Sequence, residues 1–157
     1  MSTRRSFLDE TDKEILKLVQ IDSGRPSLSK LAQVLNISKA KVKYRLDRLE
    51  KEGIIEGYRA KVNPSKLGKD EEMIIRIRAK FGPGYHKRVG QMLSNIPGVF
   101  AVYFVFGEND FVVLARASNR EEIFEKMQIL FNSEFVERTT TEIVTKTIKE
   151  DCCFFDF

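Results

Sequence analysis

The sequence contains no tryptophan, one histidine and two cysteines, and these shortages limit the chemistry open to the chain. The cysteines are neighbours, Cys152 and Cys153, so they cannot join distant segments in a disulfide framework. Two thiols without further ligands are also too few for a structural zinc site. The histidine, His86, has no serine or cysteine nucleophile motif beside it, so a catalytic dyad is not supported.

Long apolar runs and nucleotide-binding loops are missing as well. No apolar stretch approaches the roughly 20 residues that span a membrane, and the N-terminal residues lack the apolar centre of a secretory signal. No Walker loop or glycine-rich dinucleotide motif is present. We therefore expect a cytoplasmic protein that is not an enzyme, with no catalytic residues, metal site or cofactor and no membrane partner.

The cations that give the chain its net charge of +4 are concentrated at one end. Residues 1–63 hold 14 Lys and Arg against 9 Asp and Glu, a balance of +5. Residues 64–157 hold 13 against 14, a balance of −1. This asymmetry predicts a polyanion-binding domain over residues 1–63, joined to a nearly neutral domain over residues 64–157.

The basic domain has three stretches of helical periodicity. Asp9 is suited to cap a helix over residues 10–21, where further acidic residues match the positive end of the helix dipole. Ser27 and Ser38 are suited to cap two more helices. Asn36, between them, tolerates the left-handed backbone that ends a helix sharply. The short turn predicts a helix-turn-helix.

The residues after the third helix fit a wing. Gly53 stops the helix, and residues 54–62 suit a short hairpin or an extended linker. Winged helix-turn-helix proteins place the second helix of the motif in the major groove of DNA.

The expected third helix is strongly basic. Between residues 38 and 51 it carries six cations against two carboxylates, a composition that neutralises DNA phosphates with release of counterions. Its N-terminal residues would approach base edges, whereas Arg45, Arg48 and the wing residue Arg59 would fix its position on the DNA backbone. Lysines also favour a solvated helix face, but the preceding helix, the turn and the wing together favour DNA binding. The residues expected to contact DNA are Ser38, Lys39, Lys41, Lys43, Tyr44, Arg45, Arg48 and Arg59.

The hydrophobic period changes from helical to alternating near Met73. We expect strands over residues 73–81, 99–106, 111–117 and 136–148, with helices around the apolar positions 89–96 and 123–131. The nearly unbroken apolar run over residues 99–106 favours a central strand. This order is the ferredoxin-like βαββαβ arrangement. The predicted fold class is therefore α+β, with an N-terminal winged helix-turn-helix domain and a C-terminal ferredoxin-like domain.

Short motifs spread over nearly the whole chain occur in a specific order. They are Leu8-Asp9-x-x-Asp12-x-x-Ile15-Leu16, Leu31-Ala32, Ile37-Ser38, Val42-x-x-Arg45-Leu46-x-x-Leu49-Glu50, Gly53-Ile54-Ile55-x-Gly57-Tyr58, Asn63-Pro64, Leu67-Gly68, Pro97-Gly98-Val99 and Gly107-Glu108-Asn109-Asp110-Phe111. With these motifs the sequence resembles the Lrp/AsnC family of transcription regulators, also called feast/famine regulatory proteins.

The resemblance implies properties of the second domain. In this family it is a ligand-sensing and dimerisation module, dimers commonly assemble into tetramers, octamers or rings, and an amino acid often binds between subunits. Asp110 or Glu108 could accept from the ammonium of such a ligand, and backbone N–H groups or threonine hydroxyls could donate to its carboxylate. The effector-binding residues implied by the resemblance are Gly107, Glu108, Asn109, Asp110, Thr139, Thr140 and Thr141.

We thus expect a sequence-specific DNA-binding transcriptional regulator whose assembly or DNA affinity is modulated by a small amino-acid effector. Its partners would be double-stranded DNA, further copies of itself as a homodimer, tetramer, octamer or ring, and the amino-acid ligand. Two alternatives remain, an architectural DNA-binding protein without an effector and an amino-acid-binding regulatory subunit of an enzyme. The three phenylalanines in the tail, residues 151–157, are expected to seek burial at a subunit contact.

Overall fold

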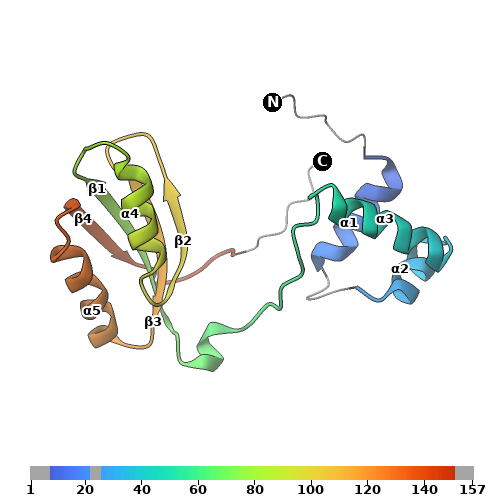
Figure 1. The fold of residues 1–157 in the computed structure, drawn as a ribbon. Coiled ribbons are helices and arrows are strands. Elements are labelled where there is room, and N and C mark those ends of the chain that lie inside the picture. The colour runs from blue at the N-terminus through green and yellow to red at the C-terminus, as the bar shows by residue number, and fades with distance from the viewer. Residues whose placement is uncertain (1–7, 22–25, 151–157) are drawn as a thin grey trace. The chain divides into compact units, whose positions relative to one another are not determined.

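The computed structural model describes residues 8–21 and 26–150, and these form two compact units (Figure 1). The first unit contains the described residues up to Val62 together with Glu150, and the second contains Asn63–Lys149. The aromatic tail over residues 151–157 lies outside the described residues. Within the described part, no helix has the length and apolar character needed to cross a membrane.

The first unit is built from three short helices, α1 (Glu10–Ile21), α2 (Leu28–Leu35) and α3 (Lys39–Lys51). Each helix contributes apolar residues at helical spacing to one core. The buried core residues are Ile15, Leu16, Leu31, Val42, Leu46, Leu49 and Ile55. The helix expected over residues 10–21 is confirmed.

Polar residues cap the N-termini of α2 and α3 and end α2, as the sequence predicts. The side-chain oxygens of Ser27 and Ser38 accept from the backbone N–H groups of Lys30 and Lys41, at 3.4 and 3.2 Å. These bonds satisfy donors that a helix N-terminus leaves free. Asn36 has a φ of 52°, the left-handed conformation that ends α2. The two helices are therefore separated by a turn of three residues.

No strand forms over residues 54–62. Gly53 ends α3 with a φ of 69°, and the Tyr58 hydroxyl donates to Glu50 Oε1 at 2.8 Å. Of the hairpin and the extended linker that the sequence allows, the structure contains the extended segment, fastened to α3 through Tyr58.

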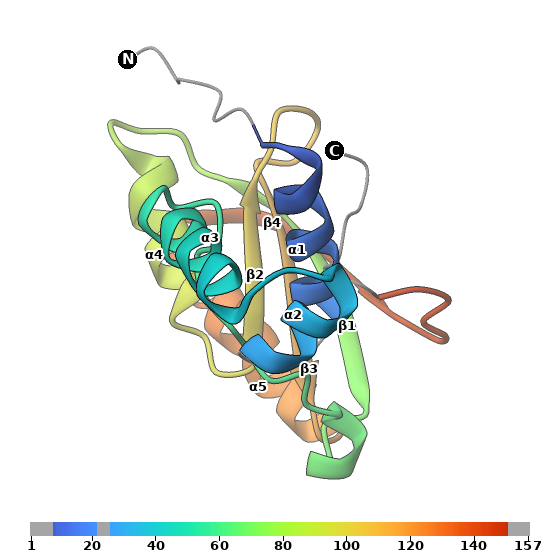
Figure 2. The same ribbon diagram turned by 90° about the vertical axis from the view of Figure 1, so that its right-hand side faces the viewer.

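The second unit begins with a 3₁₀ turn, Pro64–Leu67, and continues as a four-stranded sheet with two helices (Figures 1 and 2). In chain order the elements are β1 (Glu71–Ala79), α4 (Tyr85–Ser94), β2 (Val99–Phe104), β3 (Phe111–Ala117), α5 (Arg120–Phe131) and β4 (Val136–Ile143). The strand order is β2-β3-β1-β4, with neighbours antiparallel. This is the predicted ferredoxin-like fold.

One face of the sheet is covered by α4 and α5. Alternate residues of β1 and β3, including Met73, Ile75 and Val113, are buried with Val89 of α4 and Leu130 of α5. The other residues of these strands point to the opposite face, which α4 and α5 leave open.

The prediction of a central strand over residues 99–106 was wrong, because β2 lies at an edge of the sheet and ends at Phe104. Its apolar run does not reflect burial on both faces. Phe100 and Tyr103 remain 48% and 54% exposed, and Arg116 lies over the Phe100 ring at 5.3 Å. The last strand is also shorter than expected and ends at Ile143.

Candidate DNA interface and candidate effector region

The N-terminal half of α3 presents polar side chains to solvent. Lys39, Lys41, Lys43 and Tyr44 are exposed, next to the exposed cap residue Ser38. Within residues 8–21 and 26–150, no carboxylate lies within ion-pair distance of these lysines. This surface therefore carries three unneutralised cations within five residues.

Arg45 and Arg48 point toward α1 instead. Arg45 Nη1 lies 2.7 Å from both Asp9 Oδ2 and Asp12 Oδ1, and Arg48 Nη2 donates to Asp12 Oδ2. The Asp12 side chain is fully buried, and that of Arg45 is 13% exposed. We expected both arginines to contact the DNA backbone, but the structure gives their guanidinium groups carboxylate partners within the protein.

These contacts neutralise part of the charge of α3. Hydrogen bonds from the Arg45 guanidinium, and then from the backbone of Asp12, lower the pKa of the Asp9 carboxyl. Hydrogen bonds to the two carboxylates raise the pKa of Arg45. Two carboxylates and two guanidinium groups sum to zero, so the positive field of α3 comes mainly from its lysines.

Sequence reasoning assigned Asp9 and Asp12 only to the N-terminus of α1 and missed their link to α3. A pattern could have revealed it. Asp12 precedes Ile15 by three residues, and Arg45 follows Val42 by three, so both charges lie in the apolar stripes of their helices. Charged residues are almost never fully buried unless paired, and opposite charges in two apolar stripes indicate a buried ion pair.

The last of the eight residues expected to contact DNA, Arg59, lies in the extended segment after α3. It is exposed and follows Tyr58, which is fastened to α3. In the chain, Arg59 thus directly follows a residue whose hydroxyl is hydrogen-bonded to α3.

The turn from Gly107 to Asp110 is fixed to the end of β1. The backbone N–H of Ala79 donates to Asp110 Oδ2 at 2.8 Å, the Tyr85 hydroxyl donates to Oδ1 at 3.3 Å, and Asp110 N donates to the Ile77 carbonyl at 2.9 Å. Burial, and then the Asp110 carboxylate, raise the pKa of Tyr85. The Asp110 carboxylate therefore anchors the turn.

Glu108 lies in the same turn and connects it with β4. Arg138 Nη2 donates to Glu108 Oε1 at 2.7 Å, and Arg78 Nη1 donates to the Glu108 carbonyl at 3.0 Å. The side chains of Glu108 and Arg138 are 75% and 56% exposed. Sequence reasoning missed both arginines, which bind this turn from β1 and β4.

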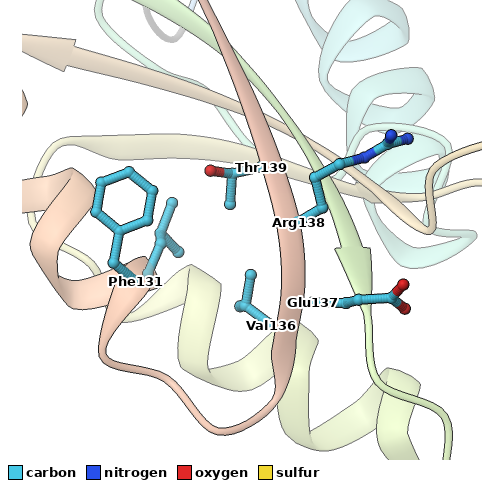
Figure 3. A pocket seen from close by; sticks show the side chains of 6 residues that line it. Phe131, Val136, Glu137, Arg138 and Thr139 are labelled. Carbon is cyan, nitrogen blue, oxygen red and sulfur yellow. The ribbon is translucent and has the colours of Figure 1, made fainter.

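The three threonines of β4 do not form one cluster. Thr139 and Thr141 alternate with the exposed Thr140, and Thr141 Oγ1 donates to Met127 Sδ of α5 at 2.9 Å. Thr139 lines a hollow of about 300 Å³ beside the end of α5, together with Leu130, Phe131, Val136, Glu137 and Arg138. Figure 3 shows Thr139, Val136 and Phe131 on one side of β4, with the Arg138 and Glu137 side chains directed to the other.

Two family models match the chain. A winged helix-turn-helix DNA-binding model matches residues 8–56, and the Lrp/AsnC ligand binding domain matches residues 72–152, which is more than half of the sequence. The chain belongs to the Lrp/AsnC family.

Relatives of this Lrp/AsnC protein include archaeal regulators. It is 33% identical over 146 residues to the HTH-type transcriptional regulator FL11 of Pyrococcus furiosus, which covers 93% of this chain and 95% of that protein. It is also 33% identical over 145 residues to an uncharacterised HTH-type transcriptional regulator of Pyrococcus abyssi, covering 92% of this chain and 97% of that protein.

Solved structures share the fold of this Lrp/AsnC protein. The transcriptional regulator NMB0573 of Neisseria meningitidis, in complex with L-Met, matches with a TM-score of 0.87 and 23% identity, over 92% of this chain and 94% of that one. AsnC of E. coli matches with a TM-score of 0.83 and 21% identity, over 94% and 99%. The family membership makes this protein a transcriptional regulator with a helix-turn-helix DNA-binding domain and an Lrp/AsnC ligand-binding domain.

Proposed function

We propose that this Lrp/AsnC protein is a sequence-specific regulator whose assembly or DNA affinity changes when an amino acid binds its second domain. The DNA-binding part of this proposal rests on the row of exposed lysines at the start of α3, which have no carboxylate partner among the described residues. Ser38, Lys39 and Lys41 would reach base edges, as residues at the start of a recognition helix do. Lys43, Tyr44 and Arg59 would contact the DNA backbone.

The ion pair between Glu108 and Arg138 supports the effector half. Both side chains are largely exposed, and ion pairs of this kind contribute only about 0–1 kcal/mol. A free amino acid carries the complementary two charges. Its ammonium would replace Arg138 at Glu108, and its carboxylate would replace Glu108 at Arg138. Asp110, with an oxygen held by the Ala79 N–H, would keep the turn in place for this exchange.

A second copy of the chain is the proposed protein partner. The sheet face that α4 and α5 leave open carries the exposed aromatic side chains of Phe100 and Tyr103. Exposed apolar patches of this kind mark association surfaces. A homodimer would also present two copies of α3 about a two-fold axis, which predicts near-palindromic sites.

Selection of bound duplexes from a random DNA pool tests the DNA half. The wild type should enrich related sites. The variant Lys39→Gln/Lys41→Gln should lose at least about tenfold in affinity for them, because each lost phosphate or base contact weakens binding. Lys61→Gln, a cation in the extended segment beyond Arg59, is a matched control with a smaller expected loss. Equal affinity of the wild type and the double variant would contradict the assignment of α3.

Calorimetric titration with each of the twenty amino acids, with and without DNA, tests the effector half. At least one should bind, and Glu108→Gln or Arg138→Gln should abolish that binding. Glu142→Gln is the matched control, because it removes an exposed ion pair with Arg76 elsewhere in the sheet. If no amino acid binds the wild type, the sensor hypothesis fails and the architectural alternative is favoured.

A further inference from the structure

Asp12 is fully buried in the first unit, and it binds two cations of α3. Arg45 Nη1 lies 2.7 Å from Asp12 Oδ1, and Arg48 Nη2 donates to Asp12 Oδ2. Asp9, at the exposed end of the same cluster, accepts from Arg45 with both of its oxygens. Each of these contacts joins residues more than 30 positions apart, so the cluster fixes α1 to α3.

A gain in the free energy of unfolding is a weak explanation for this buried ion-pair cluster. Desolvation of buried ions is costly, and replacing a buried charged triad by apolar residues is often neutral or stabilising. The cluster is also incompletely bonded, since Arg48 Nε is buried and, within the described part of the chain, has no hydrogen-bond partner. A guanidinium group restricts the relative orientation of the two helices instead, because its planar N–H groups meet carboxylate oxygens only at certain angles.

The orientation of α3 determines which of its side chains are exposed to solvent. Arg45 and Arg48 define the side of α3 that faces α1, and Lys39, Lys41 and Lys43 remain exposed. A rotation of α3 about its axis would break the bonds to Asp12 and would move every lysine relative to a bound DNA groove.

We propose that Asp12 is a positioning residue for DNA recognition. By binding Arg45 and Arg48 it sets the rotation of α3 on α1, and it keeps two of the six cations of this helix away from DNA phosphates. The lysines of α3 remain as its cations for DNA, and on a random-sequence duplex, where binding is electrostatic, they contact phosphates. This inference rests on the proposed function, because it takes α3 as the recognition helix.

The salt dependence of DNA binding distinguishes cations that contact phosphates from cations that do not. Each phosphate contact contributes about 0.9 to the slope of log affinity against log salt concentration on duplex DNA. On a random-sequence duplex, removing Lys39 and Lys41 should therefore lower the slope by about 1.8. Removing Arg45 and Arg48 together with their buried carboxylate should leave the slope unchanged.

The decisive variant is Asp12→Leu/Arg45→Met/Arg48→Met in the full chain, with folding checked by circular dichroism. Fluorescence anisotropy would measure its affinity for a random-sequence duplex and for the duplex that the wild type selects, over a series of potassium chloride concentrations. We expect an unchanged slope on the random duplex and a loss of about tenfold or more in preference for the selected one, since α3 is no longer held in one rotation. A slope lower by about 1.8 would show that the arginines contact phosphates and would overturn the proposal. An unchanged preference would overturn it equally.

Two further variants complete the test. Lys39→Gln/Lys41→Gln is the control for the recognition helix; if its slope equals that of the wild type, the assignment of α3 fails and not the role of Asp12. If the triple variant does not fold, Asp12→Asn keeps the shape of the side chain and removes its charge. Arg45 keeps its contacts with Asp9, whereas the released Arg48 guanidinium should reach a phosphate and steepen the slope by about 0.9. The same slope as the wild type would contradict the proposal.

Discussion

Each of the two units buries one charged side chain among the described residues, and the units satisfy these charges differently. Asp12 in the first unit has no exposed surface, and Lys126 in the second is 4% exposed. Asp12 binds two arginines from another helix. Lys126 pairs at 2.8 Å with Glu122, one turn earlier on its own helix. The first charge joins two elements, and the second is neutralised within one.

Glu122 extends the second cluster to the start of α5. It also accepts from Lys69 Nζ at 2.9 Å and from the backbone N–H of Ser118 at 2.7 Å, while the Asn119 side chain caps the helix. A carboxylate in the first turn is further favoured by the helix dipole. This cluster joins the N-terminus of α5 to Lys69, two residues before the start of β1. The buried charge therefore contacts a second helix in the first unit, and in the second unit it shares its partner with the segment before β1.

Replacing the first buried charge should have the largest effect. Asp12→Ala leaves Arg45 and Arg48 without their buried partner, and losses of about 3–5 kcal/mol are typical for breaking a buried pair from one side. Amide hydrogen exchange should show faster exchange throughout α1–α3 and no change in the sheet. Glu14→Ala, which removes an exposed ion pair on the same helix, should cost less than about 1 kcal/mol. Equal changes in both units would contradict the confinement of this cluster to the first unit.

The surroundings of the buried Lys126 can be tested by adding a methyl group at the neighbouring Gly98. Gly98 has a φ of 83°, and a Cβ there would overlap the Arg116 carbonyl oxygen and lie 3.0 Å from Lys126 Cε. Gly98→Ala should cost about 2–4 kcal/mol, the sum of backbone strain and overpacking. Gly53→Ala, at a φ of 69° with open space around the Cβ, should cost only about 1–2 kcal/mol. Thermal unfolding would compare them, and identical losses would show that the neighbours of Gly98 move aside.

Acid should produce the smallest of these changes in stability, through the cluster around Glu122. Hydrogen bonds from Lys126, and then from Lys69, hold the pKa of Glu122 far below its ordinary value. The stability that this carboxylate contributes is therefore complete above its unfolded pKa, near 4.3, and is lost as the pH falls below it. Urea unfolding should show Glu122→Gln less stable than the wild type at neutral pH, with a difference that shrinks in acid. A difference that persists unchanged at low pH would contradict this linkage.

Local chemistry was readable from the sequence, and long-range pairing was not. Ser27, Ser38 and Asn36 were identified correctly because a cap depends on backbone groups within a few residues. The edge position of β2 was missed because an apolar run does not indicate whether the strand has one neighbouring strand or two, or whether its side chains are covered. The inward direction of Arg45 was missed because its partners precede it by more than 30 residues.

In the candidate effector region the sequence indicated the turn but not its contacts. A glycine-acidic turn predicts its own backbone shape. The ion pair between Glu108 and Arg138, 30 residues apart, depends on how β4 pairs with β1, which only the folded sheet determines.

The cluster around Asp12 has a consequence for gene fusions. Its four side chains, Asp9, Asp12, Arg45 and Arg48, all lie within residues 8–56, which the DNA-binding family model matches. A transplant of residues 8–62 onto an unrelated sensor would keep the ion pairs that join α1 to α3. A shorter transplant that begins at Ser27 would still contain both helices of the motif, yet it would leave the two carboxylates behind. A fusion that preserves the contacts between α1 and α3 therefore has to include Asp9.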